Sequence, residues 1–376
     1  MRNRIAVLLS CVLMVFLMAD MLQAQAEDII QGRSSFNNVG NRSAEFLMIP
    51  VGSRAVALGN AYTALADDIT AVYWNPAGLA FMEQKESFFT YVDMPLDVSL
   101  TFVGAGAPVF DGQGTMAGFV EVLNFGELEQ TTVMSPNGTG IMWDSFSFAA
   151  GMSYAHNFSD RFAAGFTLKG IHESIANQTG SAFAMDFGSN YHTTINGKTV
   201  RLAFMVQNMG TPMTFTGSRL NVLIDPPDDD QGEVPPSNPR EATLLTTAFQ
   251  LPTVFKAGLA YDLMSGNGNM GASWVMTGEF AQANNQEATI SAGSEYSRYL
   301  GGEGSTTAVA LRGGYYFQRD EEGLADSPDS FEQFRGLSIG GGFTYDLGSF
   351  STTIDYAYRN MGRLTQSQHL TMKIGF

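Results

Sequence analysis

Most of the chain, from Ser87 to Phe376, alternates apolar and polar residues with a period of two. Between residues 350 and 359, for example, Ile354 and Tyr356 share one face, whereas Thr353 and Asp355 share the other. This period is typical of β-strands whose two faces meet different surroundings. Fourteen such segments lie near residues 87–92, 98–108, 114–125, 144–157, 162–175, 181–193, 200–208, 253–263, 271–281, 289–299, 307–318, 334–347, 349–359 and 368–376.

The length and polarity of these segments favour a membrane barrel over a soluble sandwich. Most have nine or more residues, and a tilted strand needs roughly 9 to 11 residues to cross a bilayer. Their polar faces carry mainly Ser, Thr, Gly and Ala with isolated charges, and only 15% of the chain is charged, against roughly 25% in soluble domains. No apolar run of about 20 residues follows position 26, which excludes a helical membrane bundle. The predicted fold class is therefore an all-β transmembrane barrel of about 14 antiparallel strands.

The connections between the predicted strands differ in length in a regular way. Those after every second strand are short, whereas those after strands 3, 7 and 11 are long. Bacterial outer-membrane barrels have short periplasmic turns and longer loops outside the cell. An even number of strands places both termini on the periplasmic side.

The N-terminus resembles a secretory signal peptide over residues 1–26. Arg2 and Arg4 precede an apolar stretch that continues to Met18, and Ala24-Gln25-Ala26 forms a cleavage site. We expect the mature chain to begin at Glu27 and to lie in the outer membrane of a Gram-negative-type bacterium. Because Cys11 is the only cysteine, its removal excludes disulfides, thiolate metal sites and cysteine nucleophiles.

The mature chain is strongly acidic. Without Arg2, Arg4 and Asp20, the 20 basic and 37 acidic residues become 18 and 36. A protein with this balance lacks the basic surface that phosphate contacts require, so we expect no nucleic-acid partner.

Residues 27–85 differ from the rest in showing helical character. The Ala-rich stretch from Arg54 to Ala66 places Leu58, Tyr62 and Leu65 on one face of a predicted helix. A second short helix is predicted to begin at Asn75, where Asn75 can cap and Pro76 suits the first position. A ring of fourteen strands encloses more space than its own side chains fill. We therefore expect residues 27–85 to form a hatch inside a barrel of residues 86–376.

Two motifs in this segment resemble known families. Residues 46–80, which contain Trp74, are similar to the PorV/PorQ family of outer-membrane proteins, and Asn75-Pro76-Ala77 matches a motif of the FadL-type transporters. The first resemblance implies a component of type IX-like protein secretion that accepts exported cargo and contacts secretion-system proteins. The second implies, as the alternative, passive transport of hydrophobic small molecules or long-chain fatty acids. The candidate hatch residues are Arg54, Gly59, Asp67, Asp68, Trp74, Asn75, Pro76, Ala77 and Gly78.

Some of these residues have a specific expected role. Arg54, Asp67 and Asp68 could pair with lumen charges or lie at a solvated periplasmic edge, and Trp74 is favoured as a packing anchor over a ligand contact. The terminal Phe376 resembles the signal that the barrel assembly machinery reads. The long connection near residues 211–251 offers an acidic, proline-rich surface for a partner, with carboxylates at Asp225, Asp228, Asp229, Asp230 and Glu233.

Motifs for catalysis and for cofactor or metal binding are weak. Gly266 to Gly271 satisfies a GxGxxG pattern, but a period-two strand follows where a nucleotide-binding motif needs a helix. The four histidines show no metal-ligand spacing, and no GxSxG nucleophile motif occurs. We expect no enzyme activity, no cofactor and no metal site.

Overall fold

The structure is a computed structural model that describes residues 42–224, 240–264, 271–300, 306–318 and 334–376. The predicted signal peptide and the acidic residues Asp225, Asp228, Asp229, Asp230 and Glu233 lie outside the described residues.

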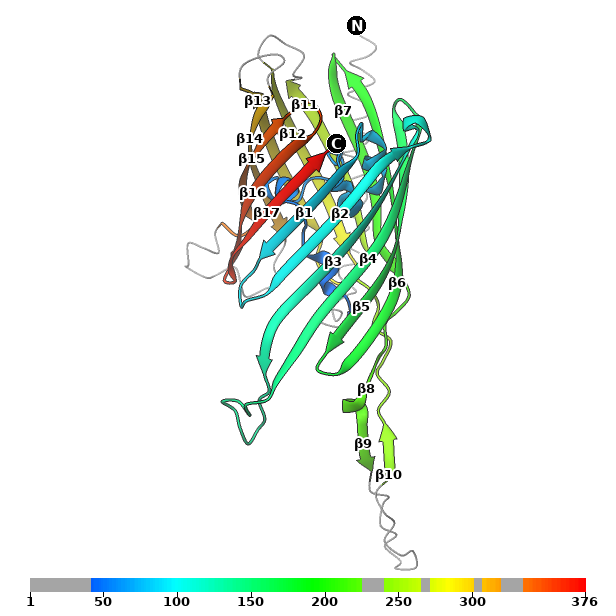
Figure 1. Ribbon diagram of the computed structural model, residues 1–376, viewed down its shortest axis with the longest axis vertical. Coiled ribbons are helices and arrows are strands. Elements are labelled where there is room, and N and C mark those ends of the chain that lie inside the picture. The colour runs from blue at the N-terminus through cyan, green and yellow to red at the C-terminus, as the bar shows by residue number, and fades with distance from the viewer. Residues whose placement is uncertain (1–41, 225–239, 265–270, 301–305, 319–333) are drawn as a thin grey trace, which may run out of the picture. The chain divides into compact units, whose positions relative to one another are not determined.

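Fourteen antiparallel strands form one closed barrel (Figure 1). Each strand pairs with the next in the ring, β7 pairs directly with β11, and β1 pairs with β17 to close it. The strands are β1 (Glu86–Asp93), β2 (Ser99–Val109), β3 (Gly114–Glu129), β4 (Met142–Ser159), β5 (Phe162–Ile175), β6 (Gln178–Ile195), β7 (Lys198–Gly210), β11 (Val254–Met264), β12 (Ala272–Ala283), β13 (Thr289–Tyr299), β14 (Thr307–Gln318), β15 (Leu337–Asp346), β16 (Ser351–Gly362) and β17 (Thr365–Gly375).

The predicted alternation separates an apolar outer face from a mixed inner face. In β17, Leu370 and Met372 are exposed on the outside, whereas His369 and Thr371 are buried on the inside. A shift of one residue in the pairing would exchange these two faces, so the hydrophobic pattern specifies the register. The fold class predicted from the sequence is confirmed.

The two ends of the barrel differ in their connections. Strand β1 begins and β17 ends at the same end, which we call the turn end. The long connections 130–141, 211–253 and 319–336 follow β3, β7 and β14 at the opposite end, which we call the loop end. The length asymmetry expected from the sequence is present.

Residues 42–85, which we call the inner segment, precede β1 and contact the inner face of the wall. They contain the 3-10 helix η1 (Glu45–Met48), the α-helices α2 (Ser53–Ala57) and α3 (Ala71–Trp74), and the 3-10 helix η2 (Pro76–Phe81). Helix α2 lies against β14 to β17, and η2 lies against β3 to β6 (Figure 1). Most of the buried core therefore lies between this segment and the wall. Among the described residues, no helix is long and apolar enough to cross a membrane.

The predicted helix over residues 54–66 is wrong in its extent. Helix α2 ends at Ala57, and Gly59 and Asn60 follow with φ values of 68° and 70°. These left-handed residues stop a helix, so Leu58, Tyr62 and Leu65 do not share one helical face. The cap predicted at Asn75 is confirmed, because the backbone N–H of Ala77 donates to its Oδ1 at 3.1 Å.

The connection between β7 and β11, which the sequence suggested was a loop, contains further strands. Strand β8 (Phe215–Gly217) extends the sheet by pairing with the loop end of β6. A short 3-10 helix, η4 (Ser218–Leu220), follows. Strands β9 (Asn221–Ile224) and β10 (Arg240–Thr243) pair only with each other and form a ribbon beyond the loop end (Figure 1).

Candidate functional site

The inner segment lies directly against the barrel wall because glycines occupy several inward positions of the strands. A Cβ atom on Gly165 would lie 2.6 Å from the carbonyl carbon of Pro76, and a Cβ on Gly314 would overlap the carbonyl carbon of Leu58. Atoms cannot approach this closely, so only a residue without a side chain allows such contact. The small residues on the inner faces of these strands thus make room for the inner segment.

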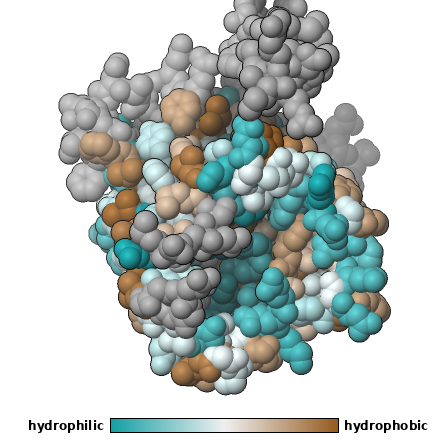
Figure 2. Space-filling model, turned by 90° about the horizontal axis from the view of Figure 1, so that it is seen from above, coloured by the Kyte–Doolittle hydropathy of each residue, from teal (hydrophilic) through white to brown (hydrophobic). Residues whose placement is uncertain are grey.

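An ionic cluster joins the inner segment to the wall toward the turn end. The guanidinium of Arg54 donates from Nε and from its second terminal nitrogen to the two carboxylate oxygens of Glu295, both at 2.9 Å. It also donates to Asp67 Oδ1 at 2.9 Å. Glu295 accepts a further hydrogen bond from Arg312, which in turn pairs with Asp355. Figure 2, which views the barrel from above, shows a central hollow with mainly hydrophilic visible walls.

A second ion pair lies beside this cluster. Lys373 on β17 donates from Nζ to Asp68 Oδ2 at 2.8 Å, and the backbone N–H of Thr70 donates to Asp68 Oδ1 at 3.0 Å. Burial alone would raise the pKa of Asp68, but Lys373 and Arg54 together hold that pKa well below its usual range. The sequence left open whether Arg54, Asp67 and Asp68 pair with lumen charges or lie at a solvated edge. Arg54 and Asp68 have partners on the wall, whereas the side chain of Asp67 is 43% exposed.

The remaining motif residues take part in packing within the lumen. Trp74 is 2% exposed, and its indole N–H donates to the carbonyl oxygen of Val51 at 2.7 Å. The amide of Asn75 donates to the carbonyl oxygen of Thr63 at 3.0 Å and to that of Ser189 on the wall at 3.3 Å. Gly78 lies so close to the carbonyl oxygen of Ala66 that a side chain would overlap it. At the C-terminus, the backbone N–H of Phe376 donates to the carbonyl oxygen of Lys85 at 2.9 Å.

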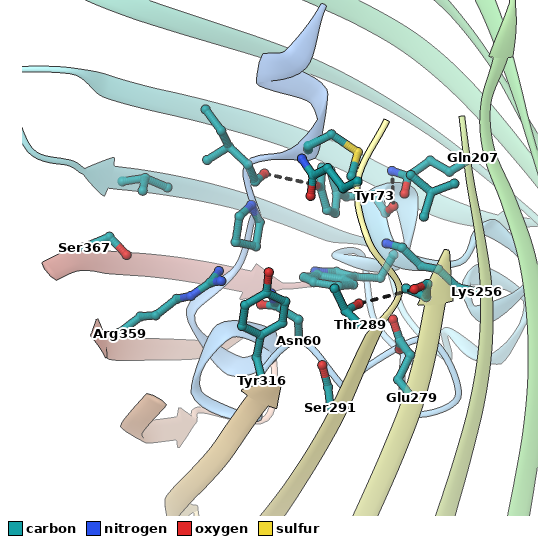
Figure 3. Close-up of a pocket in the computed structure, with 18 of the residues that line it drawn as sticks. Asn60, Tyr73, Gln207, Lys256, Glu279, Thr289, Ser291, Tyr316, Arg359 and Ser367 are labelled. Carbon is teal, nitrogen blue, oxygen red and sulfur yellow. Dashed lines mark hydrogen bonds between the residues drawn. The ribbon is translucent and has the colours of Figure 1, made fainter. Parts of the chain in front are cut away.

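A cavity of about 350 Å³ lies between the inner segment and the wall (Figure 3). Wall residues near the loop end, such as Val92, Val254 and Ser367, form part of its lining, and η1 with the residues after it covers one side. Burial raises the pKa of the η1 residue Glu45, against the opposing hydrogen bond from Asn285. The cavity also exposes apolar side chains, which include Met48, Ile49, Pro50, Met94 and Ala281.

Polar and aromatic side chains complete the cavity lining. Lys256 Nζ lies 4.6 Å from the centre of a Trp74 ring and 5.8 Å from the Tyr73 ring. Opposite to it in Figure 3, the Arg359 guanidinium lies 4.7 Å from the centre of the Tyr316 ring. The sequence alone does not reveal this site, because the residues that line it come from ten separate elements and share no local motif. The unequal lengths of the connections distinguish the end of the barrel at which the cavity lies, but they do not identify the residues that line it.

A second cavity of about 490 Å³, which we call the wall groove, lies where β7 leaves the barrel. Its lining comes from β5, β6, β7 and the residue that follows, namely Leu168, Lys169, Gly170, Phe183, Ala184, Met185, Met209, Gly210 and Thr211. The pairing of β6 with β7 shifts register between Met185 and Phe187. Opposite this shift, consecutive residues Gln207 and Asn208 are both buried, as in a β-bulge.

A buried polar network supports the bulge behind the wall groove. Lys169 Nζ donates to Asp186 Oδ2 at 2.9 Å and to Asn208 Oδ1 at 2.5 Å, and the backbone N–H of Asn208 donates to Asp186 Oδ1 at 2.7 Å. The side chains of Lys169 and Asp186 are 4% and 1% exposed. Breaking a charge pair this buried would leave an uncompensated charge, so the network holds three strands together. Within the described part of the chain, no cluster of three metal-ligating side chains occurs.

Comparison with known proteins relates the fold to outer-membrane barrels. No protein-family model and no curated protein sequence matches the chain. Among solved structures, the toluene transporter TbuX of Ralstonia pickettii is similar with a TM-score of 0.51 and 10% identity, over 88% of this chain and 98% of TbuX. The toluene transporter TodX of Pseudomonas putida has a TM-score of 0.50 and 10% identity, over 86% of this chain and 96% of TodX. The chain therefore shares the barrel fold of these two structures.

Proposed function

We propose that the protein is a passive outer-membrane channel for small hydrophobic molecules, with the loop end facing outside and the inner segment as its plug. The observation that carries this proposal is the cavity of about 350 Å³ near the loop end, which exposes more apolar than polar surface. A sealed structural barrel needs no such space, since protein interiors are close-packed. Its fold is also that of TbuX and TodX, which are toluene transporters.

The packing of the inner segment suggests a sideways route out of the lumen. Leu58, Tyr62 and Leu79 of the inner segment are fully buried, and the ionic cluster joins this segment to the wall toward the turn end, so we expect it to block a straight path to that end. The wall groove lies at the break in register between β6 and β7 and is lined mainly by apolar side chains. In the proposed route, a molecule enters from the loop end and leaves through the wall at this groove.

Filling the wall groove tests the proposed route. Gly170 lines the groove, and a Cβ there would meet only the Phe183 ring at 3.9 Å, so Gly170→Trp occupies the groove without a local clash. Gly278→Trp on β12 is the matched control, because it adds the same side chain at a position where a Cβ would meet only the carbonyl oxygen of Ser291, at 3.8 Å.

The measurement is uptake of radiolabelled toluene by cells in which this barrel is the only channel for hydrophobic compounds. We expect uptake above that of cells without the barrel, a rate near background for Gly170→Trp, and an unchanged rate for Gly278→Trp. Absence of uptake with the unaltered protein rejects the channel. Equal uptake by both variants rejects the sideways route.

A second candidate is the PorV/PorQ-type role in protein export, and the ribbon of β9 and β10 favours it. A two-stranded ribbon is only marginally stable alone, and its unpaired edges can accept another strand. Around it, Leu223 and Leu245 are 70% and 93% exposed. Such a surface fits a protein partner better than it fits a channel.

Removing residues 218–244 tests this second candidate. The unaltered barrel and the shortened variant would be isolated from outer membranes in mild detergent, and copurifying proteins would be identified. An export component should retain secretion-system proteins or cargo only when the ribbon is present. Identical sets of copurifying proteins would count against this role.

A further inference from the structure

Two cations that line the loop-end cavity have no hydrogen-bond acceptor among the described residues. Lys256 is 8% exposed, and its ammonium group contacts the faces of Trp74 and Tyr73. The guanidinium of Arg359 lies over the Tyr316 ring. Neither cation donates a hydrogen bond to any acceptor among the residues that the structure describes. Such groups are normally satisfied when they are buried, so their donors are available to a ligand.

The carboxylates around the same cavity do not neutralise these cations by direct contact. Glu279 Oε2 accepts the backbone N–H groups of Tyr62 and Thr63, at 3.0 and 2.8 Å. Glu45 Oε1 accepts a hydrogen bond from the Asn285 amide at 2.6 Å. The two carboxylates therefore accept hydrogen bonds from the inner segment and from the connection beside it, whereas Arg359 and Lys256 face the cavity.

The size and lining of the cavity limit the body of a ligand. A volume of about 350 Å³ lies at the low end of the roughly 300 to 1,000 Å³ typical of small-molecule sites. Tyr73 and Trp74 meet edge to face with ring centres 5.2 Å apart, and Tyr316 lines the cavity beside Arg359. These rings favour a compact, flat apolar body over a long flexible chain.

We propose that the cavity binds a compact aromatic carboxylate. The carboxylate accepts hydrogen bonds from the fork of Arg359 N–H groups, and the ring of the ligand packs against Tyr73 and Trp74. Lys256 adds positive potential from the opposite side of the cavity (Figure 3). This inference rests on the proposed channel function and makes its substrate class acidic. A neutral hydrocarbon would leave the Arg359 donors unsatisfied and would gain nothing from the positive potential of Lys256.

Equilibrium binding to the purified full-length barrel in detergent tests this site. Benzoate, toluene and palmitate would be titrated separately by calorimetry. We expect benzoate to bind more tightly than either toluene or palmitate. Arg359→Gln should weaken benzoate binding by about tenfold or more, because it removes the charge and the paired donors. Lys256→Gln should weaken benzoate binding less, because Lys256 attracts the carboxylate electrostatically without donating a hydrogen bond to it.

Arg298→Gln is the matched control, since Arg298 is an exposed residue of β13 that does not line the cavity. Retention of the compact, heat-modifiable barrel on gels shows that each variant is folded. If Arg359→Gln does not fold, Arg359→Lys keeps the charge and loses the fork, and should also bind benzoate more weakly. Equal affinity of the unaltered protein for toluene and benzoate, tighter binding of palmitate, or benzoate binding that no cavity variant changes overturns the proposal.

The result is independent of the uptake experiment. Benzoate binding that depends on Arg359 supports the site even if no toluene crosses the membrane. Toluene uptake without benzoate binding supports the channel and overturns the acidic substrate class.

Discussion

At the scale of single residues, the absence of a side chain decides how the inner segment meets the wall. The turn at Leu58 and Gly59 lies on the backbone of β14 at Gly314. The next residue along the strand, Gly313, points to open space, where a Cβ would meet nothing within 4 Å. Two neighbouring glycines therefore differ completely in their tolerance of substitution, although the sequence shows them as a simple pair.

Gly314→Ala should destabilise the barrel, whereas Gly313→Ala should not. The added methyl group at Gly314 must displace the turn at Leu58, and overpacking of this kind costs about 1 to 3 kcal/mol. The measurement is the denaturant midpoint of unfolding in detergent, with Gly313→Ala as the control. Equal midpoints for the two variants would show that the inner segment does not lie on β14.

Arg54→Met should also lower the free energy of unfolding. The change removes a two-point contact with Glu295, and breaking a buried ion pair costs about 3 to 5 kcal/mol. Glu295 keeps Arg312 as a partner, so we expect about 3 kcal/mol. The double variant Arg54→Met/Glu295→Gln, measured by the same denaturant titration, should cost less than the sum of the single changes. Strict additivity would mean that the two groups do not interact.

At the scale of elements, the inner segment is held by its contacts rather than by its own secondary structure. Its longest α-helix, α2, has five residues, and isolated helices this short are unstable in water. The sequence predicted a longer helix, because the stretch from Arg54 to Ala66 is rich in Ala, which has a high helix propensity. The contacts of Gly59 with the wall, which local propensity does not include, determine where the helix ends.

The pairing of Asp68 with Lys373 predicts a pH dependence. The folded-state pKa of Asp68 is lowered from its ordinary value of 3.8, so the ionised form is favoured in the folded state. The resulting stability is fully present above pH 3.8 and is lost as the pH falls below that value. Unfolding midpoints measured from pH 7 to pH 3 should fall more steeply for the unaltered protein than for Asp68→Asn. Parallel pH profiles would contradict this assignment.

At the scale of the whole molecule, closure of the barrel removes every free edge from the wall. Strands β1 and β17 lie at opposite ends of the strand sequence, yet they pair over the full length of β1, from Glu86 with Gly375 to Asp93 with Gln368. A sheet that closes on itself leaves no unpaired strand to aggregate or to face lipid. The final strand therefore completes the fold, and the chain cannot be a stable barrel before it is synthesised.

Deletion of Phe376 should reduce the amount of folded barrel in the outer membrane. Phe376 continues the outward apolar pattern of Leu370 and Met372, and its N–H is bonded next to the start of β1. The amount of heat-modifiable protein in isolated outer membranes measures assembly. Phe376→Tyr keeps an aromatic terminus and should assemble normally. Normal assembly of the deletion variant would reject the predicted signal.

The sequence by itself determined the strand number, the facing of each strand and the end with long connections. These features follow from period two, from strand length and from turn residues, all of which are local properties of the chain. The same alternation places Asp186, Glu279 and Glu295 on the inner face, and all three are buried. A cap such as Asn75 could be predicted because its partner is two residues away.

Only the tertiary structure decided the partners and the cavities. Arg54 and Glu295 are separated by 241 residues, and no pattern in one sequence connects them. The cavity that contains Lys256 and Arg359 depends on the ring order of the strands and on how deeply the inner segment lies. The wall groove depends on one bulge at Asn208, which changes which side chains face inward. Local residue patterns determine whether a side chain faces into or out of the barrel, whereas closure of the ring determines which residues that side chain contacts.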